Sequence, residues 1–245
     1  WMNNLFNLKI IKKKIDSFTF SEDKKEKSEK IISNWSSRLI SGELDKQNEK
    51  MLQGDFLRDF FQTILDYPSI TTTPNNYNFI QHPKTETDAR REPDGELGFF
   101  GDIRLTKAVI ELKVSKANLD KKQHRSENLS PVEQAFFYIP KYDSCDWAIV
   151  SNFREIRLYS KERGQGFYHS FKLLDLKSEL KLFYFLLCKD NLISEKGVST
   201  TFELLKETTT REQIISEKFY EDYKNIRKNL FNHLSKNNDG IEKEI

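Results

Sequence analysis

The sequence predicts an α/β protein in which a mixed central β-sheet is flanked by helices and followed by a helical segment. Three observations support this fold class. Through the middle of the chain, helical and strand patterns alternate in the order helix, strand, strand, helix, strand, strand. Residues 172–235 are helical again. The length of 245 residues, of which 37% are hydrophobic, is enough to bury the core of one such domain with a helical appendage.

Two helices are expected before the sheet. Residues 21–40 begin with polar residues and continue with an apolar stripe, and Ser21 is the expected N-terminal cap. In residues 45–67, apolar side chains recur at three- and four-residue steps, which predicts an amphipathic helix that Pro68 ends. The composition of residues 69–91 is typical of a long loop.

Short apolar runs bounded by turn residues predict the strands. They are residues 77–80, 96–100, 108–114, 147–151 and 155–160. Gly101-Asp102 is the expected tight turn between the second and third of these strands. Between the third and fourth, residues 131–142 form a helix that starts with Ser130-Pro131. Three later helices are expected at residues 172–188, 201–207 and 211–235.

Composition excludes several classes of protein. With 40 basic and 38 acidic residues, the net charge is only +2, so any nucleic-acid binding must depend on a local basic surface. Cys145 and Cys188 are too few for a disulfide framework or a cysteine metal site. The four histidines do not have the spacing of zinc ligands, which argues against a zinc site. No apolar run is long enough to span a membrane. The first lysines follow apolar residues, unlike a secretory signal, and we expect a cytoplasmic protein without membrane contact.

The strand at residues 108–114 carries an unusual pair of charges. Glu111 and Lys113 share one face of this strand, while the apolar Ile110 and Leu112 share the other. An acid and a lysine inside an apolar strand are unfavourable unless they have partners. A divalent ion and a phosphate group would be suitable partners.

A second acid is expected next to this pair. If Gly101-Asp102 form the turn, Asp94 faces Val109, and Glu111 is its diagonal neighbour at roughly 7–8 Å on the same face. Two carboxylates at such a separation can bind one Mg²⁺. In the alternative register Asp102 lies opposite Glu111, but the residues that would then turn include no Gly, Asn or Pro. Asp94 is therefore favoured.

These residues carry a family resemblance. Pro93-Asp94 followed by Glu111-x-Lys113 resembles the PD-(D/E)xK nuclease signature, and Gln134 with Tyr138 resembles the Q-x-x-x-Y motif of its RecB-like members. More widely, P-D-G-E-L-G-F-F, V-I-E-L-K and P-V-E-Q-A-F-F-Y resemble the N-terminal endonuclease region of Type IIG restriction enzymes, which fuse endonuclease and methyltransferase. The likeness covers roughly residues 45–235. It implies a restriction-endonuclease-like fold and a double-stranded DNA substrate.

The resemblance also implies roles for individual residues. Asp94, Glu111 and the carbonyl of Leu112 would hold Mg²⁺, with Mn²⁺ as a substitute, and whether one or two metal ions bind stays open. Lys113 would orient or deprotonate the attacking water. Gln134 would point toward that water or toward Lys113.

Further residues are assigned by the same resemblance or by their position. The family's early-helix carboxylate matches Glu49 best, with Asp55 as a rival. A basic segment just beyond the active strand is the expected contact for DNA phosphates. Its basic residues are Lys116, Lys121, Lys122 and Arg125.

The expected organisation has three parts. Residues 1–44 are an N-terminal helical segment, residues 45–170 the nuclease core, and residues 171–245 a helical connector. The chain lacks the glycine-rich cofactor loop and the N-P-P-[FY] motif of a methyltransferase, so we expect that region and target recognition elsewhere in the same full-length chain. A transient dimer is one arrangement that would cut both strands. The alternatives are a stand-alone RecB-like nuclease and an inactive nuclease fold that binds DNA or protein.

Overall fold

The computed structural model describes residues 4–82, 92–123 and 128–237 of the chain. The chain divides into two compact units, Trp1–Leu204 and Leu205–Ile245. The first unit holds the sheet and the helices that pack on it. Residues 205–237 of the second unit belong to one α-helix, and residues 211–234 of that helix are exposed along their whole length.

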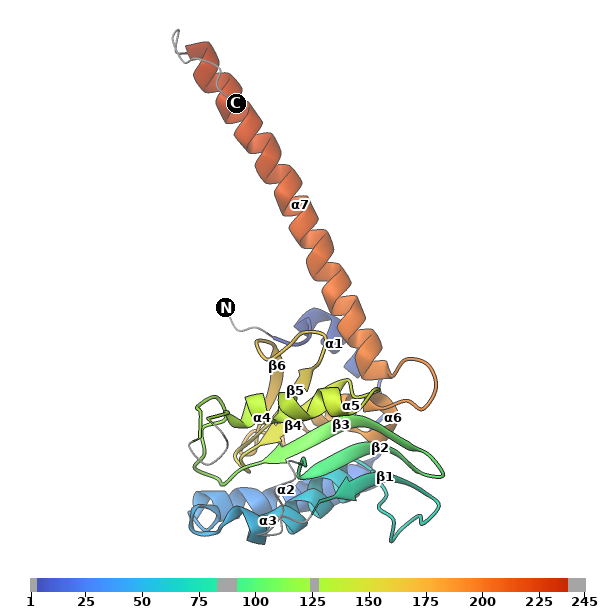
Figure 1. Cartoon of the computed structure of the whole chain (residues 1–245). Coiled ribbons are helices and arrows are strands. Elements are labelled where there is room, and N and C mark those ends of the chain that lie inside the picture. The colour runs from blue at the N-terminus through green and yellow to red at the C-terminus, as the bar shows by residue number, and fades with distance from the viewer. Residues whose placement is uncertain (1–3, 83–91, 124–127, 238–245) are drawn as a thin grey trace. The chain divides into compact units, whose positions relative to one another are not determined.

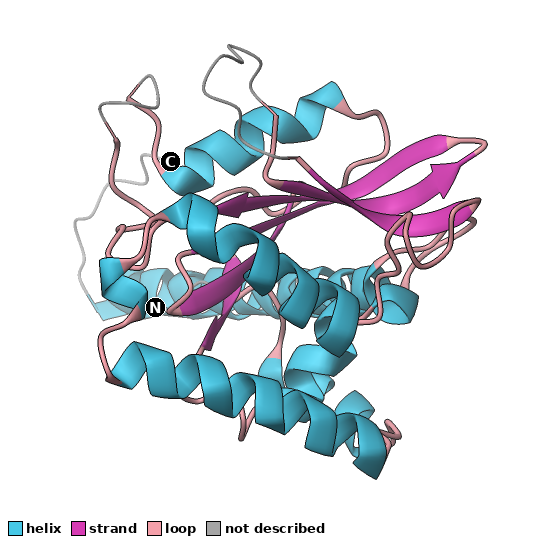
Figure 2. Ribbon diagram, turned by 90° about the horizontal axis from the view of Figure 1, so that it is seen from below, coloured by secondary structure: helices cyan, strands magenta, loops and turns pink. Residues whose placement is uncertain are grey.

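The sheet has six strands in the spatial order β1-β2-β3-β4-β5-β6 (Figure 1). They are β1 (Asn76–Gln81), β2 (Gly95–Gly101), β3 (Arg104–Leu112), β4 (Trp147–Ser151), β5 (Glu155–Ser160) and β6 (Tyr168–Lys172). β3 and β4 are parallel, and all other neighbours are antiparallel. A parallel pair needs a crossover connection, which here contains a helix. The predicted mixed sheet is therefore confirmed, and Figure 2 shows its twist.

Helices cover both faces of the sheet. Those of the first unit, with the helix that leads out of it, are α1 (Leu8–Asp16), α2 (Glu22–Ile40), the 3₁₀-helix η1 (Leu44–Lys46), α3 (Glu49–Phe56), the π-helix η2 (Leu57–Ile64), α4 (Pro131–Tyr138), the 3₁₀-helix η3 (Ile139–Lys141), α5 (Leu180–Leu187), α6 (Lys189–Leu192) and α7 (Thr200–Asn237). Figure 1 shows α2 and α3 on one side of the strands and α4 on the other. This arrangement confirms the predicted α/β fold class.

Each face has its own core. On the α4 side, Val132 and Ala135 pack with Val109 and Val150 of the sheet. On the α2–α3 side the core is aromatic: the ring of Phe56 lies 5.3 Å from Trp35 and 5.0 Å from Phe153, both edge-on. Such edge-to-face pairs add to the free energy of burial. The two cores hold α3 and α4 on opposite faces of the sheet.

Several predicted elements agree closely with the structure. β4 and β5 have the predicted bounds, and α2 starts after Ser21, whose Oγ accepts a hydrogen bond from the backbone N–H of Lys24 at 3.3 Å. The helix predicted from residue 45 begins instead at Glu49, because the side chain of Asn48 caps it by accepting from Met51 N. It then widens into η2.

Other predictions were wrong. β6 was not predicted, because its five residues are too few to give a clear strand pattern and its pairing with β5 decides its structure. The helix predicted at residues 172–188 begins only at Leu180, since Asp175 and Ser178 make local hydrogen bonds that favour turns. Residues 201–207 and 211–235, predicted as two helices, lie in one helix.

The predicted turn between β2 and β3 was also wrong, and this changes the register. Phe100 pairs with Arg104, so the turn has three residues, Gly101, Asp102 and Ile103, instead of two. Gly101 has φ 144°, in the region that favours glycine. An irregularity then shifts the pairing between Leu97 and Gly98, which adds one residue to β3.

The shifted register has a direct consequence for the acids. Gly95 pairs with Ile110. Asp94 directly precedes Gly95 and donates its backbone N–H to the carbonyl of Ile110, so it lies beside Ile110 and Glu111, whereas the sequence had predicted Val109 opposite Asp94. Asp102, the acid of the alternative register, lies in the exposed turn.

Candidate active site

Three charged side chains are buried where β2 begins and β3 ends. Asp94 immediately precedes β2, Glu111 is the last but one residue of β3, and Lys113 directly follows β3. Their exposed fractions are 1%, 0% and 7%. Because an isolated buried charge is strongly unfavourable, each of them needs partners. The structure supplies these from the strand ends and from α3.

The carboxylate of Asp94 is bound at the end of β3. The backbone N–H of Asp94 donates to the carbonyl of Ile110 at 2.8 Å, which continues the β2–β3 ladder. Its Oδ2 accepts from the backbone N–H of Leu112 at 2.6 Å, and its Oδ1 accepts from Nε2 of Gln53 on α3 at 3.3 Å. These bonds fix the orientation of the carboxylate.

Lys113 and Glu111 form a buried ion pair. Nζ of Lys113 donates to Oε1 of Glu111. The backbone N–H of Lys113 donates to the carbonyl of Ser151 at 2.9 Å, which extends the β3–β4 pairing by one step. Removing one member of such a pair leaves an uncompensated buried charge. The ion pair and this backbone bond together hold the ammonium group of Lys113 beside the carboxylate of Glu111 at the end of β3.

The oxygen atoms at this place suit a hard divalent cation. Among the described residues, no group of three His, Cys, Asp or Glu side chains could hold a metal ion. The donors here are instead the two carboxylates of Asp94 and Glu111 and one carbonyl. In an extended strand, the N–H and C=O of one residue project to the same side, so the carbonyl of Leu112 faces the Asp94 side. Mg²⁺ is usually bound by one or two carboxylates together with waters, which this donor set fits.

Gln53 is a residue of this region that sequence reasoning did not select. It is 3% exposed and donates from Nε2 both to Asp94 and to the carbonyl of His82, each at 3.3 Å. Glu49 lies four residues earlier on α3 and therefore on the same face as Gln53. Asp55 is exposed and pairs with Arg58 at 2.8 Å. The helix geometry thus favours Glu49 over its rival.

Gln134 and Tyr138 bind each other within α4. Nε2 of Gln134 donates to the hydroxyl of Tyr138 at 2.9 Å, and Tyr138 is 1% exposed. The Oε1 atom of Gln134 is buried and has no hydrogen-bond partner within the described part of the chain. The expectation that Gln134 points toward Lys113 or the attacking water stays a prediction.

Comparison with known proteins places the chain in a family. The family described as "MmeI, N-terminal domain" matches residues 26–199, a range that starts within α2, ends directly before α7 and includes Asp94, Glu111 and Lys113. The chain belongs to this family. It corresponds to the N-terminal nuclease region of a Type IIG restriction enzyme, as its resemblance implied. A search of curated proteins and a search of solved structures each found no match.

The basic segment of this MmeI-type domain is partly described. Lys116, Lys121 and Lys122 are exposed, and Arg125 lies outside the described residues. Lys116 lines a cavity of about 390 Å³ together with Arg154. The expected contact between these residues and DNA phosphates stays a prediction.

The loop that carries Lys116 is held in place from two sides. Oγ of Ser115 donates to Oδ1 of Asp45 at 2.6 Å, and Arg154 donates to both oxygens of Asp45 at 2.6 and 2.8 Å. Nδ2 of Asn152 donates to the carbonyl of Ala117 at 2.8 Å. The turn between β4 and β5 therefore positions the chain that follows Lys113.

A second buried carboxylate, Glu96, was not selected from the sequence. It is fully buried and accepts hydrogen bonds from Arg104, Thr106 and Tyr142 at 2.6, 2.6 and 2.9 Å, and one of its oxygens lies 2.6 Å from Nε2 of His82. Burial by itself raises the pKa of Glu96, but hydrogen bonds from these groups and the charge of Arg104 lower it to about 2. The signal that pointed to Glu111, an acid inside an apolar strand, is also present at Glu96.

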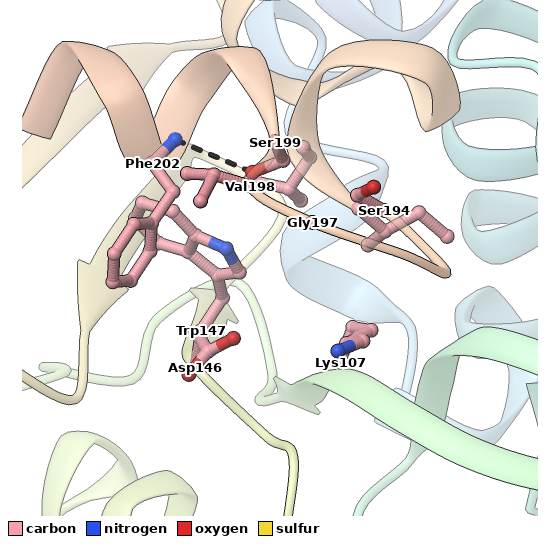
Figure 3. Close-up of a pocket in the computed structure, with 10 residues that line it drawn as sticks. Lys107, Asp146, Trp147, Ser194, Gly197, Val198, Ser199 and Phe202 are labelled. Atoms are coloured by element: carbon pink, nitrogen blue, oxygen red, sulfur yellow. Dashed lines mark hydrogen bonds between the residues drawn. The ribbon is translucent and has the colours of Figure 1, made fainter.

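A separate small pocket lies at the other end of β4 (Figure 3). Lys107, Asp146 and Trp147 face residues 194–202 across a cavity of about 90 Å³. Burial raises the pKa of Asp146. Ligand sites for drug-sized molecules have volumes of about 300–1,000 Å³, so this pocket is too small for a nucleotide. It also adjoins the start of β4, whereas Lys113 pairs with the end of β4.

Proposed function

We propose that this chain is the Mg²⁺-dependent DNA endonuclease region of a Type IIG restriction enzyme. The observation that carries the proposal is the buried group of Asp94, Glu111 and Lys113. A binding module has no use for three buried charges, whose desolvation is unfavourable. Membership in the MmeI N-terminal domain family supports the same reaction class.

The proposed roles follow from the donor atoms. Asp94, Glu111 and the carbonyl of Leu112 would hold the metal ion, and Gln53 keeps Asp94 oriented through its bond to Oδ1. When bound, Mg²⁺ would lower the pKa of water and stabilise the negative charge that develops on the phosphate. Lys113 would orient the attacking water and offset charge on the phosphate. Glu49 and Gln134 are further candidates for holding that water.

The proposal includes the partners. The substrate is double-stranded DNA, and the methyltransferase and target-recognition region belong to the same full-length chain. The described part of the chain contains no helix that is long and apolar enough to cross a membrane. A transient dimer would allow both DNA strands to be cut. A stand-alone nuclease of the RecB-like type would instead degrade linear DNA and spare closed circles.

The decisive test compares two lysines of the same strand region. We expect Lys113→Ala to lower the cleavage rate of plasmid DNA in Mg²⁺ by about 100-fold or more, the range for loss of a positioned proton-transfer group. Lys107→Ala is the matched control, because Lys107 lies on β3 at the small pocket remote from Asp94. Cleavage is measured with closed-circular and with linear DNA.

A second measurement makes the test independent of turnover. Glu111→Ala should weaken binding of Mn²⁺, measured by calorimetry, and should leave the circular dichroism spectrum unchanged. Full cleavage activity in either Lys113→Ala or Glu111→Ala would contradict the assignment. DNA binding without cleavage in Mg²⁺ or Mn²⁺ would favour the inactive module.

A further inference from the structure

A groove between α3–η2 and β1 adjoins the candidate active site. Its volume is about 760 Å³. We call it the α3–β1 groove, and its polar walls include Asp55, Arg58 and Gln62 from the helical side, Tyr77 and Gln81 from β1, and Arg104 from β3. All of its lining residues belong to the described part of the first unit.

The groove lies next to residues that contact the site. Gly54, which lines it, directly follows Gln53, and Gln81 directly precedes His82. Gln53 donates to both the carbonyl of His82 and the carboxylate of Asp94. A Cβ added to Gly54 would lie 3.7 Å from Nε2 of Gln81, so α3 and β1 approach each other here. The groove therefore borders two residues, Gln53 and His82, that connect to Asp94 through hydrogen bonds.

Two arginines are the cationic groups of the groove. The lining contains Arg58 and Arg104 against one acid, Asp55; Arg58 pairs with Asp55 at 2.8 Å and with Asp59, outside the lining, at 3.4 Å. Arg104 donates to the buried Glu96 at 2.6 Å, while 58% of its side chain stays exposed. The buried carboxylate thus holds Nη2 of the Arg104 guanidinium, while much of the side chain stays at the surface, a suitable arrangement for a phosphate contact.

The other lining groups suit a nucleic-acid strand. Gln62 and Gln81 offer amide donors, Tyr77 offers a half-buried ring and a hydroxyl, and Ile70 is 53% exposed. Donors for phosphates combined with an aromatic ring for a base are the pattern of strand-binding channels. An extended peptide is the weaker candidate, because the backbone N–H groups of Asn78 and Phe79 already donate to the carbonyl of Pro68 at the edge of β1.

We propose that the α3–β1 groove binds the DNA strand next to the phosphate that is cleaved. The inference rests on the proposed nuclease function and adds to it a path for the substrate on the α3 side. The predicted basic segment lies after β3, so the groove extends the contact to the other side of Asp94.

The test uses Arg58→Ala in the full chain, with Arg38→Ala as the matched control. Both arginines are exposed helical residues, and Arg38 bonds to Asn34 on α2. Binding of a fluorescent DNA duplex is measured by anisotropy without metal, over a series of salt concentrations. Loss of one phosphate contact should weaken binding several-fold and reduce the slope of log K against log salt by about one. Arg38→Ala should change neither quantity.

Cross-linking supplies the second readout. Duplexes that carry a photoreactive thymine should form cross-links to Tyr77 or Gln81, located by mass spectrometry. If Arg58→Ala binds like wild type and cross-links map only to residues 116–122, the groove does not bind DNA and the proposed nuclease function stands. If wild-type protein neither binds nor cleaves DNA, both proposals are overturned.

Discussion

At the scale of single residues, the site depends on bonds between side chains distant in sequence. Gln53 reaches Asp94 across 41 positions, and Tyr142 reaches Glu96 across 46. Buried carboxylates with several donors are oriented, because turning them would leave donors or acceptors unpaired. The orientation of Asp94 therefore depends on α3 as much as on its own strand.

A residue-scale prediction concerns the pH dependence of stability. Burial lowers the pKa of His169, in β6, from 6.5 to about 4. The folded state thus disfavours the protonated ring, so stability is complete above pH 6.5 and is lost as the pH falls toward 4. The loss should be at most about 3 kcal/mol, at 1.36 kcal/mol per unit of pKa.

The variant His169→Phe should remove most of this dependence. The ring lies 6.1 Å from Phe6 and 4.7 Å from Phe171, so phenylalanine suits its surroundings. Urea unfolding at pH 7 and pH 4.5 gives the free energies. His233→Gln, at an exposed position on α7, is the control. Equal pH dependence in wild type and His169→Phe would contradict the prediction.

At the scale of elements, the irregularity in the β2–β3 pair sets the geometry of the site. The three-residue turn and the shift between Leu97 and Gly98 each move the register by one residue, so that Asp94 lies at the end of β3 next to Glu111 and not opposite Val109. At Gly98 the strands approach closely, since an added Cβ would lie 2.2 Å from the carbonyl oxygen of Leu105. Only a residue without a side chain fits there.

We expect Gly98→Ala to destabilise the protein by about 1–3 kcal/mol, the usual range for overpacking a well-packed site. Because the strands must move apart, cleavage activity should fall as well. Gly54→Ala is the contrasting change: its nearest neighbour would be at 3.7 Å, and alanine is the better helix former, so stability should not fall. Thermal unfolding of both variants measures their stabilities and tests both expectations. A neutral Gly98→Ala would show that the bulge tolerates a side chain.

At the scale of the whole molecule, the chain consists of a packed unit and a helical unit. The first unit has two cores, one on each face of the sheet. In the second, large apolar side chains such as Phe219, Tyr223 and Ile226 are 71%, 56% and 66% exposed. An exposed apolar series of this kind is characteristic of a surface that binds other protein. It agrees with the proposal that residues 171–245 connect to a methyltransferase region.

The division into a packed unit and a helical unit predicts how removal of the long helix affects stability. Residues 211–234 are all exposed. Removing residues 211–245 therefore removes no buried side chain at positions 211–234. The melting temperature of residues 1–210, followed by circular dichroism, should stay within a few degrees of the full chain, since exposed positions contribute little. A large drop would show that the long helix stabilises the first unit. Internal deletion of residues 69–75 is the contrasting control, because Pro68 and Ser69 cover β1.

The sequence alone determined what local pattern and composition express. Short apolar runs bounded by turn residues predicted β4 and β5 at their observed bounds, and capping residues predicted α2. The acid and lysine in an apolar strand singled out Glu111 and Lys113. These signals lie within a few neighbouring residues. Only the tertiary structure decided the register of Asp94, the bonds of Gln53 and Glu96, and the strand β6. Those features depend on contacts between segments far apart in the chain, where packing and strand pairing outweigh local propensity.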